Sequence, residues 1–400
     1  MLTSRLLKVF ASRTRFTTTL GAIVAMAAIA VPVAAGTASA ATSAARPGAS
    51  AAIRAPFPAT MGAMRCWSLT NCMAVGANTP QMATQLIAER WNGSRWSRST
   101  LPKPSGTAEV TIGGLACPSR TECVAVGAGY PPPTSKSGSF PVVERWNGSR
   151  WTASRAVEVG SDDILAAVSC PAVKSCYAVG SYAPKGAAFA PLVEHWNGAT
   201  WSRQAVSVPR GTSDGMLTAL SCSSAALCVA VGSDGSGVLI ERWNGRGWWL
   251  AASRSAPSAS LYGVSCPSAT SCFAVGSSLT ASGGSLVERW NGKSWSASTT
   301  PVPRKASYAG LQSVSCVSAA HCLAVGNDVN PGVYAAAWNG HGWHLVAMTT
   351  TGGHIGAFTA VTCLTATSCV ALTATTQFAA SARSEAAFWN GTRWKVVRTA

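Results

Sequence analysis

Negative charge is scarce in this 400-residue chain, where 14 Asp plus Glu stand against 31 Lys plus Arg and give a formal net charge of +17. Charged residues of both signs make up only 11% of the chain and hydrophobic residues 48%, which excludes a chain that is disordered throughout. So few charges, together with 38 Gly and 21 Pro, also exclude a coiled coil or a long-helix protein. No segment after residue 40 shows a convincing helical period over about 11 residues.

Long apolar stretches are scarce as well, and the one that suggests targeting, Leu20–Ala35, lies near the N-terminus. Four basic residues precede it: Arg5, Lys8, Arg13 and Arg15. Ala38-Ser39-Ala40 then supplies the small-x-small sequence that signal peptidase accepts, so residues 1–40 are predicted to be a signal peptide for the general secretory route. The alternative is an uncleaved membrane anchor, for which about 16 apolar residues are short because a bilayer span takes about 20.

Cleavage after Ala40 would leave a mature chain with a net charge of +13, from 27 basic and 14 acidic residues. The Ala-, Ser- and Pro-rich segment 41–58 is predicted to be a flexible lead-in. We therefore expect a protein that is secreted, extracellular or associated with the cell wall, and that does not span a membrane after cleavage.

Cysteine and tryptophan follow a repeat that occurs seven times. All 14 cysteines fall in pairs with five residues between the members: Cys66/Cys72, Cys117/Cys123, Cys170/Cys176, Cys222/Cys228, Cys266/Cys272, Cys316/Cys322 and Cys363/Cys369. About 20 residues after each pair comes Trp-Asn-Gly-x-x-Trp, with its tryptophans at Trp91/Trp96, Trp146/Trp151, Trp196/Trp201, Trp243/Trp248, Trp290/Trp295, Trp338/Trp343 and Trp389/Trp394. Two coupled motifs in one fixed order define seven units of about 50 residues.

Each unit is predicted to form four short antiparallel strands. In the fifth unit, Leu261–Cys266 and Cys272–Gly276 are short apolar runs separated by turn residues, and Leu286–Trp290 alternates between its two faces. Asn291-Gly292 predicts a tight hairpin because both residues tolerate positive φ, and Trp295 begins the fourth strand.

Sheets of this size with apolar side chains on both faces have to be packed between neighbours. Seven such sheets close most simply into a ring, which predicts an all-β fold: a seven-bladed β-propeller of four-stranded blades over residues 59–400, expected to be a monomer. The alternative is an open solenoid, which would need polar and atypical end units. The first and last units here are nearly regular, which favours closure.

The cysteine spacing predicts one disulfide in each blade, at the base of the hairpin that joins its first two strands. Export would permit oxidation of the cysteines. The alternative, a metal site, is disfavoured because five intervening residues exceed the usual zinc spacing and no histidine recurs beside the pairs. We therefore expect no metal and no cofactor.

The segment Asn92-Gly93-Ser94-Arg95-Trp96 and its counterparts resemble a degenerate Asp box, the Ser-x-Asp-x-Gly-x-x-Trp turn of sialidase-like propellers. The repeat length also resembles that of kelch propellers. The resemblance covers about residues 60–400 but departs from the Asp box, since Asn replaces Asp and the leading Ser is absent. In those families the turn is structural and lies away from the active site, so the resemblance implies no activity.

A catalytic site is not evident, and no catalytic residue is assigned. Five of the 14 acids recur before the first Trp of a unit, and the other nine form no spaced pair typical of glycosidase carboxylates. We expect a non-catalytic binding or scaffold protein. The alternative is a glycoside hydrolase or lyase whose catalytic residues lie on variable loops.

A Glu-Arg-Trp triplet precedes four of the Asn-Gly turns: Glu89-Arg90-Trp91, Glu144-Arg145-Trp146, Glu241-Arg242-Trp243 and Glu288-Arg289-Trp290. In one interpretation, the Glu of one blade meets the Arg of its neighbour in a broken ring of ion pairs, which sets register more than it adds stability. In the other, which resembles propeller lectins, Arg and Glu hold sugar hydroxyls between blades while Trp stacks on the sugar ring.

The two uniform sets of turns are predicted to share one end of the ring, and the variable connections the other. Because specificity usually resides on variable loops carried by a rigid frame, the variable end is the predicted ligand site. Its candidate residues are Tyr130, Tyr182, Asp328 and Tyr334.

The partners left open are a glycan, an anionic cell-wall polymer or another protein, and the positive charge favours acidic partners. Nucleic acid is not expected, because the arginines are dispersed through the repeats without a clustered basic stripe.

Overall fold

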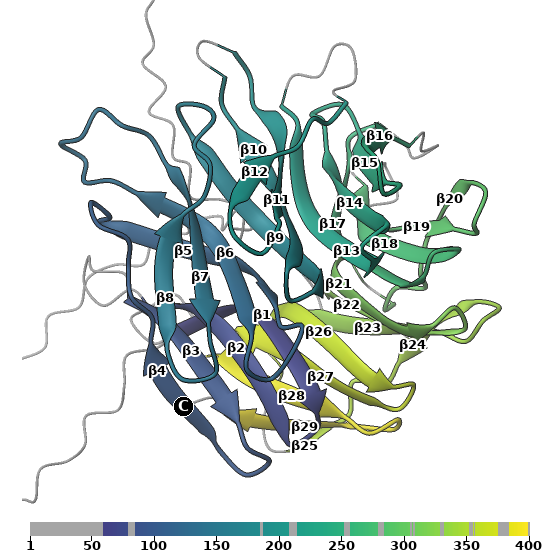
Figure 1. The fold of residues 1–400 in the computed structure, drawn as a ribbon. Helices are drawn as coiled ribbons and strands as arrows, with labels where there is room; N and C mark the ends of the chain where they lie inside the picture. Colours follow the sequence, from purple (N-terminus) through teal and green to yellow (C-terminus); the bar gives the residue numbers. More distant parts are fainter. Residues whose placement is uncertain are drawn as a thin grey trace, which may run out of the picture. The chain divides into compact units, whose positions relative to one another are not determined.

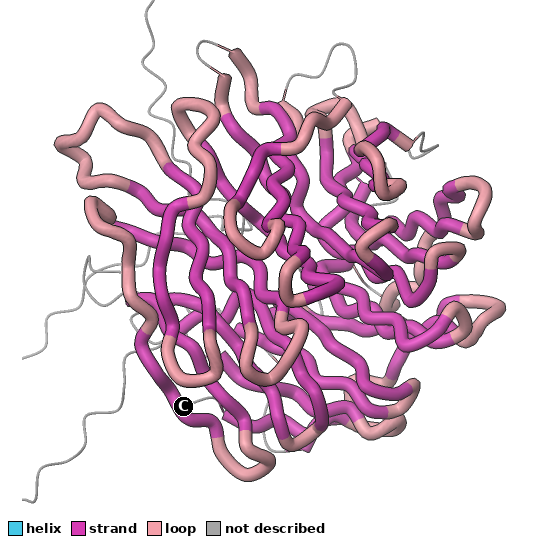
Figure 2. The backbone as a smooth tube through the Cα atoms, in the orientation of Figure 1, coloured by secondary structure: helices cyan, strands magenta, loops and turns pink. Residues whose placement is uncertain are grey.

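The computed structural model describes residues 59–78, 85–184, 187–207, 214–251, 257–278, 284–304, 306, 309–328, 332–351, 355, 357–374 and 384–398, all within the unit Ala55–Ala400. None of these residues is helical, and they form 29 strands (Figures 1 and 2). No helix that could cross a membrane is therefore found among them. The predicted signal peptide, 1–40, and the predicted lead-in, 41–58, lie outside the described residues.

Consecutive strands form seven sheets, which we call blades 1 to 7. Blade 1 contains β1 (Ala59–Ser68), β2 (Asn71–Asn78), β3 (Gln85–Trp91) and β4 (Trp96–Thr100). Blade 2 contains β5 (Glu109–Ala116), β6 (Cys123–Tyr130), β7 (Phe140–Trp146) and β8 (Trp151–Arg155). Blade 3 contains β9 (Asp163–Ala172), β10 (Ser175–Tyr182), β11 (Ala190–Trp196) and β12 (Trp201–Arg203).

Blades 4 to 7 follow the same order. Blade 4 contains β13 (Met216–Ser224), β14 (Leu227–Ser233), β15 (Val238–Trp243) and β16 (Trp248–Leu250), and blade 5 contains β17 (Ala259–Ser268), β18 (Ser271–Ser278), β19 (Ser285–Trp290) and β20 (Trp295–Ser298). Blade 6 contains β21 (Ala309–Ser318), β22 (His321–Asp328), β23 (Val333–Trp338) and β24 (Trp343–Val346). Blade 7 contains β26 (Ala357–Thr365), β27 (Ser368–Ala374), β28 (Ser384–Trp389) and β29 (Trp394–Arg398), with the short β25 (Thr350–Thr351) added parallel to β29.

The repeated residues align in one row across each blade. In blade 1, Cys66 pairs with Cys72, Cys72 with Trp91, and Trp91 with Trp96. The β-sheet register thus places both motifs at the same end of the blade, beside the hairpins that join strands 1 to 2 and 3 to 4. We call this the Asn-Gly end and the opposite one the connection end.

All seven predicted disulfides are present, and no cysteine is free. The two Cα atoms of each pair lie 3.9–4.1 Å apart, and in blades 1, 4, 6 and 7 the two cysteines are direct cross-strand neighbours. Each bridge therefore closes a small loop within one blade and does not link blades to each other.

The bridges lie at the base of a hairpin and are largely covered, although the first cysteine is half-buried in four of the seven pairs. The second cysteine of every pair is buried, and five of these residues have no exposed surface at all: Cys72, Cys176, Cys228, Cys272 and Cys369. The cause is packing, because each belongs to an apolar cluster that also contains a tryptophan of the Trp-Asn-Gly-x-x-Trp motif. A ligand therefore cannot reach Cys176, Cys228 or Cys369, and these cysteines serve the fold and not a binding site.

Closure of the ring depends on side chains. The first strands of consecutive blades pack side by side, and β26 packs against β1, so that the two ends of the repeat array meet (Figure 1). No blade combines strands from both ends of the chain. Instead, the Met61 N–H donates to Ser384 Oγ at 2.9 Å, and the Trp91 and Phe388 ring centroids lie 5.3 Å apart. The prediction of a seven-bladed β-propeller is confirmed, and the open solenoid is wrong.

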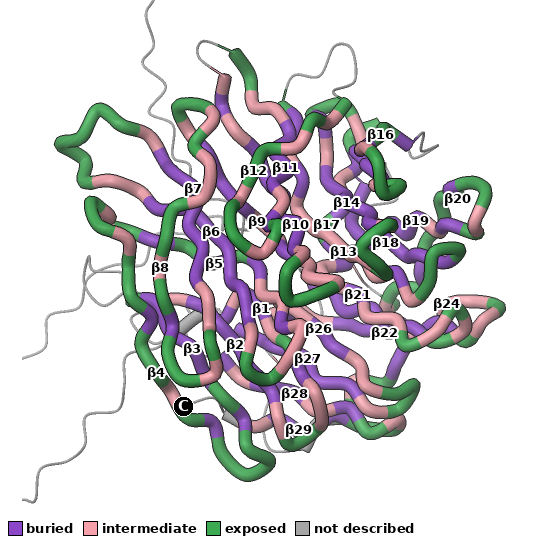
Figure 3. Tube along the Cα trace, in the orientation of Figure 1, coloured by how far each residue is buried: buried purple, intermediate pink, exposed green. Residues whose placement is uncertain are grey.

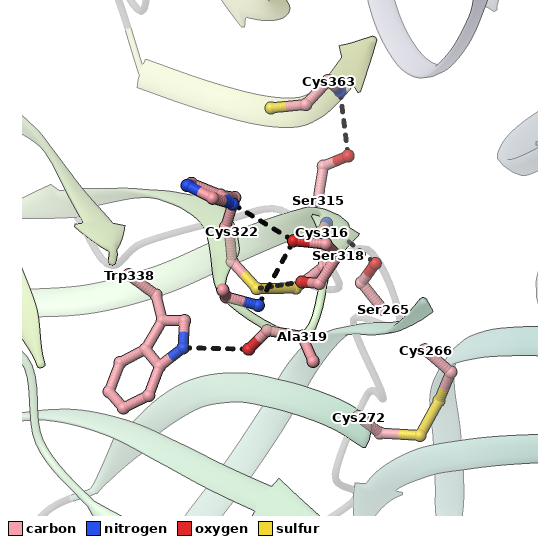
Figure 4. Close-up of a disulfide and its surroundings, with 12 residues drawn as sticks. Ser265, Cys266, Cys272, Ser315, Cys316, Ser318, Ala319, Cys322, Trp338 and Cys363 are labelled. Atoms are coloured by element: carbon pink, nitrogen blue, oxygen red, sulfur yellow. Dashed lines mark hydrogen bonds between the residues drawn. A yellow bond between two sulfur atoms is a disulfide. The ribbon is translucent and has the colours of Figure 1, made fainter. Parts of the chain in front are cut away.

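A serine that precedes the first cysteine links several neighbouring blades. Ser169, Ser221, Ser265 and Ser315 each accept, through Oγ, the backbone N–H of the first cysteine in the following blade, at 2.9–3.1 Å. Figure 4 shows the bonds from Cys316 to Ser265 and from Cys363 to Ser315. Blades 1 and 2 approach closely through glycine instead, since a Cβ on Gly62 would lie 2.5 Å from the carbonyl oxygen of Ile112.

The core consists of seven apolar clusters, each formed by the facing sides of two neighbouring blades. The second and third strands of the blades are accordingly mostly buried, whereas the loops and most of the fourth strands are exposed (Figure 3). In blade 1, Leu86 and Ala88 on β3 pack towards blade 2. Ile87 and Trp91 pack towards blade 7. Arg90 shares the first of these faces and Glu89 the second, because side chains alternate along a strand.

The Asn-Gly turns have the predicted bounds but differ from the expectation that both Asn291 and Gly292 adopt positive φ. Four residues separate the paired tryptophans, and of Asn and Gly only the glycine has positive φ, for example +94° at Gly292. The Asn291 side chain accepts the backbone N–H groups of Lys293 and Ser294, both at 2.9 Å. Asn is thus required for its side-chain acceptor and not for a positive φ.

Replacing Asn244 by alanine is expected to lower the free energy of unfolding by about 1 kcal/mol, because the N–H groups of Arg246 and Gly247 lose their acceptor at an exposed turn. Denaturant unfolding measures the loss. Asn244→Asp is the matched control, since it keeps the acceptor oxygen and should stay near the wild-type value. Equal losses in both variants would contradict this role of the side chain.

Candidate functional site

One strand position controls access between blades at the Asn-Gly end. The residue before the first Trp of a blade faces the first Trp of the next blade. Arg145 lies 4.3 Å from the Trp196 ring centroid, Arg242 lies 3.8 Å from that of Trp290, and Arg289 lies 4.9 Å from that of Trp338. At these three junctions a cation covers the indole and fills the space between the blades.

Two other junctions are closed by aromatic packing. Phe388 of blade 7 packs on Trp91, and Tyr177 of blade 3 lies between His195 of its own blade and Trp243 of blade 4. The Tyr177–His195 centroids are 4.4 Å apart and the rings stack.

The remaining two junctions coincide with two cavities on the described part of the chain. Between blades 1 and 2, Arg90 makes no ring contact with Trp146 and is exposed, and a groove of about 410 Å³ lies there. Between blades 6 and 7, the corresponding residue is Ala337, too short to reach the next blade, and a groove of about 240 Å³ lies there. Each groove thus lies where the covering side chain is displaced or missing.

The groove between blades 1 and 2 is the larger and the more strongly charged. It is lined by residues of β3, β4 and the β7–β8 hairpin: Arg90, Ser97, Arg98, Ser99, Thr100, Trp146, Ser149, Arg150 and Trp151. Three guanidinium groups and two indoles thus surround a space that falls in the range of small-ligand pockets.

Positive charge in this groove is only partly neutralised. Arg98 is held by Glu89, whose Oε1 accepts from Nε at 2.9 Å and from Nη2 at 2.7 Å. Arg90 and Arg150 form no ion pair within the described residues. By contrast, Arg145 at the next junction has Glu122 at 4.0 Å. The groove therefore carries guanidinium donors without a carboxylate to receive them.

The Trp146 indole, like that of Trp196, also lacks, within the described ranges, a hydrogen-bond partner that four of its counterparts have. The indole N–H of Trp91, Trp243, Trp290 and Trp338 donates to a carbonyl in the cysteine hairpin of the same blade, as Figure 4 shows for Trp338 and Ala319. The Trp146 N–H has no acceptor among the described residues.

The smaller groove between blades 6 and 7 has a different lining. His321 and His344 of blade 6 face the cysteine hairpin of blade 7 across Ala337. His321 Nδ1 lies 3.2 Å from Ser318 Oγ. No group of three metal-ligating side chains occurs there or elsewhere in the described ranges.

The disulfides lie beside the grooves and contribute little to their lining. Cys322 and Cys363 line the smaller groove, and no cysteine lines the larger one. Cys176, Cys228 and Cys369 are completely buried in the interior of blades 3, 4 and 7 and are not site residues in the sense of contacting a ligand.

The repeated glutamates are sealed inside the blade junctions. Glu89, Glu144, Glu194, Glu241 and Glu288 are all completely buried, each opposite an alanine of the second strand that leaves room for the carboxyl. Burial raises the pKa of Glu144 and of Glu241 to about 8 and that of Glu194 to about 7. Neither oxygen of Glu144 or Glu241 has a hydrogen-bond partner in the described residues.

This placement separates the members of the Glu-Arg-Trp triplet. Glu and Arg lie on opposite faces of the strand as expected, but Arg145, Arg242 and Arg289 contact the next blade's Trp and not its Glu. At these junctions the predicted interblade ion pairs are therefore replaced by cation–aromatic contacts. For sugar binding, the structure brings Arg90 together with Trp146 at the groove, while the glutamates lie behind the surface.

The four candidates at the connection end do not converge. Tyr130 ends β6 and Tyr182 ends β10, in neighbouring blades, and both are half-buried. The Tyr182 hydroxyl accepts from Arg203, which also lies over its ring. Asp328 and Tyr334 belong to blade 6 and are buried, at 5% and 1% exposure. Burial raises the pKa of Tyr130 and of Tyr334.

Several residues of the groove were not singled out by the sequence, namely Ser97, Arg98, Ser99, Thr100, Ser149 and Arg150. An available signal was the register: Arg98 is the cross-strand partner of Glu89, which could be counted from the paired tryptophans. The serine before the first cysteine was also overlooked, although it recurs in four units.

No protein-family model and no curated protein matches this chain. Among solved structures, YCF48 from Cyanidioschyzon merolae is similar at 12% identity with a TM-score of 0.51, covering 84% of this chain and 97% of that one. YCF48 bound to D1 peptide has 14% identity, a TM-score of 0.48 and coverage of 80% and 90%. The six-bladed fucose-recognising Aleuria aurantia lectin has 13% identity, a TM-score of 0.44 and coverage of 70% and 92%.

At these identities the first of these similarities shows a common fold and nothing about ligands, and the other two carry no argument. The resemblance to Asp-box and kelch propellers stays a prediction.

Proposed function

We propose that this protein is a non-catalytic binding protein, and that the groove between blades 1 and 2 holds a saccharide unit bearing a carboxylate, sulfate or phosphate. The observation that carries the proposal is the convergence of Arg90, Arg98 and Arg150 beside Trp146 and Trp151 in a space of about 410 Å³.

Each component of the groove suits part of such a ligand. Guanidinium groups bind carboxylate, sulfate or phosphate through paired N–H donors. Indole rings pack on the apolar face of a sugar, and the hydroxyl groups of Ser97, Ser99, Thr100 and Ser149 can exchange hydrogen bonds with sugar hydroxyls.

Binding is favoured over catalysis because no carboxylate lines this groove. Glu144, on the same face of its strand as Trp146, is completely buried behind the groove, and Glu89 is buried and engaged by Arg98. At the connection end, Asp162 accepts the Ser139 N–H at 3.0 Å, and Asp163 accepts the N–H groups of Val159 and Gly160, so both of these carboxyls hold loops in place. Seven disulfides are consistent with an oxidising, extracellular location.

Replacing Arg90 by alanine is expected to weaken binding of an anionic glycan at least about tenfold, the loss typical of one charge-assisted hydrogen bond. A glycan array that contains uronic acids, sulfated sugars and neutral sugars identifies the ligand, and calorimetry with the best hit measures the change.

Arg145→Ala is the matched control, since Arg145 occupies the same position in blade 2 but covers Trp196. It should leave the affinity unchanged. An array without anionic hits, or equal losses for Arg90→Ala and Arg145→Ala, would overturn the proposal.

A further inference from the structure

The acidic side chains are distributed unevenly between the two ends of the blades. All 14 acids are described: five are the buried glutamates, and eight lie towards the connection end, namely Glu109, Glu158, Asp162, Asp163, Asp214, Asp234, Asp328 and Glu385. Glu122, in the cysteine hairpin of blade 2, is the remaining acid and the one that lies at the Asn-Gly end.

Among the described residues, exposed basic side chains occur at both ends but are more numerous at the Asn-Gly end. Ten exposed ones lie in its turns or next to the Cys–Trp row: Arg65, Arg90, Arg95, Arg120, Arg150, Lys174, Arg246, Lys293, Arg393 and Lys395. The sequence disperses them at intervals of a repeat, and the fold brings them together because every repeat presents the same two hairpins at this end. We call these ten residues the basic face.

We propose that the basic face binds a long, linear anionic polysaccharide, one unit of which occupies the groove between blades 1 and 2. The inference rests on the proposed function for that one unit and extends it to the polymer. Arg90 and Arg150 belong both to the groove and to the basic face, so a chain that leaves the groove continues over further cations.

The position of the cations favours a thin chain over a flat bilayer. Arg90 and Arg150 line the groove between blades 1 and 2, which a polymer strand can enter and a membrane plane cannot. The loops at the tips are the polar Asn-Gly turns, and the two tryptophans that flank each turn are buried or half-buried. The exposed apolar side chains at this end, such as Leu69, Val173 and Trp249, belong to three different blades.

The proposed polymer site has one part in the groove between blades 1 and 2 and another part on blades away from that groove. The two parts can be tested separately. Arg246, Lys293 and Arg393 stand at turn tips of blades 4, 5 and 7, away from the groove. Electrostatic attraction at these distances is screened over about 8 Å at physiological salt, so each tip acts on the polymer segment directly above it.

The test uses dextran sulfate as polymer and a sulfated disaccharide as short ligand, with biolayer interferometry on the full oxidised chain. The variant Arg246→Ser/Lys293→Ser/Arg393→Ser is expected to weaken dextran sulfate binding at least tenfold and to leave disaccharide binding unchanged. Lys103→Ser/Lys136→Ser/Arg304→Ser is the matched control, because it removes the same charge from exposed positions at the connection end. It should keep the polymer affinity within twofold.

Equal losses in the two triple variants would overturn the inference, because net charge alone would then explain binding. So would tip-dependent binding of phosphatidylglycerol vesicles or duplex DNA without binding of dextran sulfate. A third outcome separates the two proposals. If the triple variant weakens polymer binding but the wild-type protein does not bind the disaccharide, the proposed function of the groove is wrong and the inference about the basic face is supported.

Discussion

Replacing Glu144 by glutamine is expected to stabilise the protein at pH 8 by a few kcal/mol and to change its stability little at pH 4. The carboxyl is completely buried between blades 1 and 2 and has no hydrogen-bond partner among the described residues. Its ionised form is therefore disfavoured, and burial raises its pKa to about 8.

The direction of the pH dependence follows from proton binding. Between pH 4.5, the ordinary value, and pH 8, the unfolded state has lost this proton and the folded state keeps it. Stability is then highest below pH 4.5 and falls as the pH rises, by about 1.4 kcal/mol for each pH unit and each such carboxyl. Burial raises the pKa of Glu241 to about 8 as well, so it contributes a similar loss of stability with rising pH. The contribution of Glu194 is smaller, because its carboxylate accepts the Val157 N–H and its pKa is raised only to about 7.

Urea unfolding midpoints measured between pH 4 and pH 8.5 check this expectation. The wild-type midpoint should fall across the range, and Glu144→Gln/Glu241→Gln should flatten the profile. Glu89→Gln is the matched control in the same strand position: its carboxylate is paired with Arg98, so its neutral replacement should destabilise the protein near pH 7. Parallel profiles for wild type and the double variant would show that these carboxyls do not stay protonated.

Glu89 and Glu144 occupy the same position in the repeat, but only Glu89 is ion-paired in the described part of the chain, and the sequence of the repeat does not predict this difference. The fold was predictable because the Cys pairs and the Trp-Asn-Gly-x-x-Trp motif fix strand number and register, and the seven disulfides follow from the same spacing. Whether a given glutamate is ion-paired was not predictable from the repeat. Arg98 stands opposite Glu89 and pairs with it, whereas Ala153 stands opposite Glu144. Arg203 stands opposite Glu194 but donates to Tyr182 instead.

The two grooves could not be predicted from the sequence either, because they also depend on contacts between residues of different blades. Arg90 and Arg145 occupy the same place in the repeat, yet only Arg145 covers the next indole. What distinguishes them is the neighbouring charge: Arg90 shares its groove with Arg98 and Arg150, while Arg145 has Glu122 nearby. Such differences arise from contacts between neighbouring blades, and the sequence of one repeat unit does not show these contacts. The basic face likewise appears only when the hairpins of different blades are brought together at one end, with six of the seven blades contributing to it.

Reduction of all seven disulfides is expected to lower the melting temperature by about 20 °C. Each bridge closes a loop with a sequence separation of 6, for which loop-closure entropy gives about 2 kcal/mol. Seven bridges then contribute about 14 kcal/mol, comparable to the whole stability of a typical domain. With an unfolding entropy of about 0.7 kcal/mol per degree for a chain of this size, that loss corresponds to the stated shift.

The architecture makes the propeller depend on these bridges more than a ring with a shared strand would. Blades 1 and 7 meet only through contacts such as Met61 with Ser384 and Trp91 with Phe388, so each blade has to keep its own shape for the ring to stay closed. Calorimetry of the oxidised protein and of protein reduced in urea and refolded under nitrogen measures the effect. Cys222→Ala/Cys228→Ala, which opens one bridge, should cost about 3 °C. A reduced protein that melts within 5 °C of the oxidised form would show that interblade packing alone holds the ring.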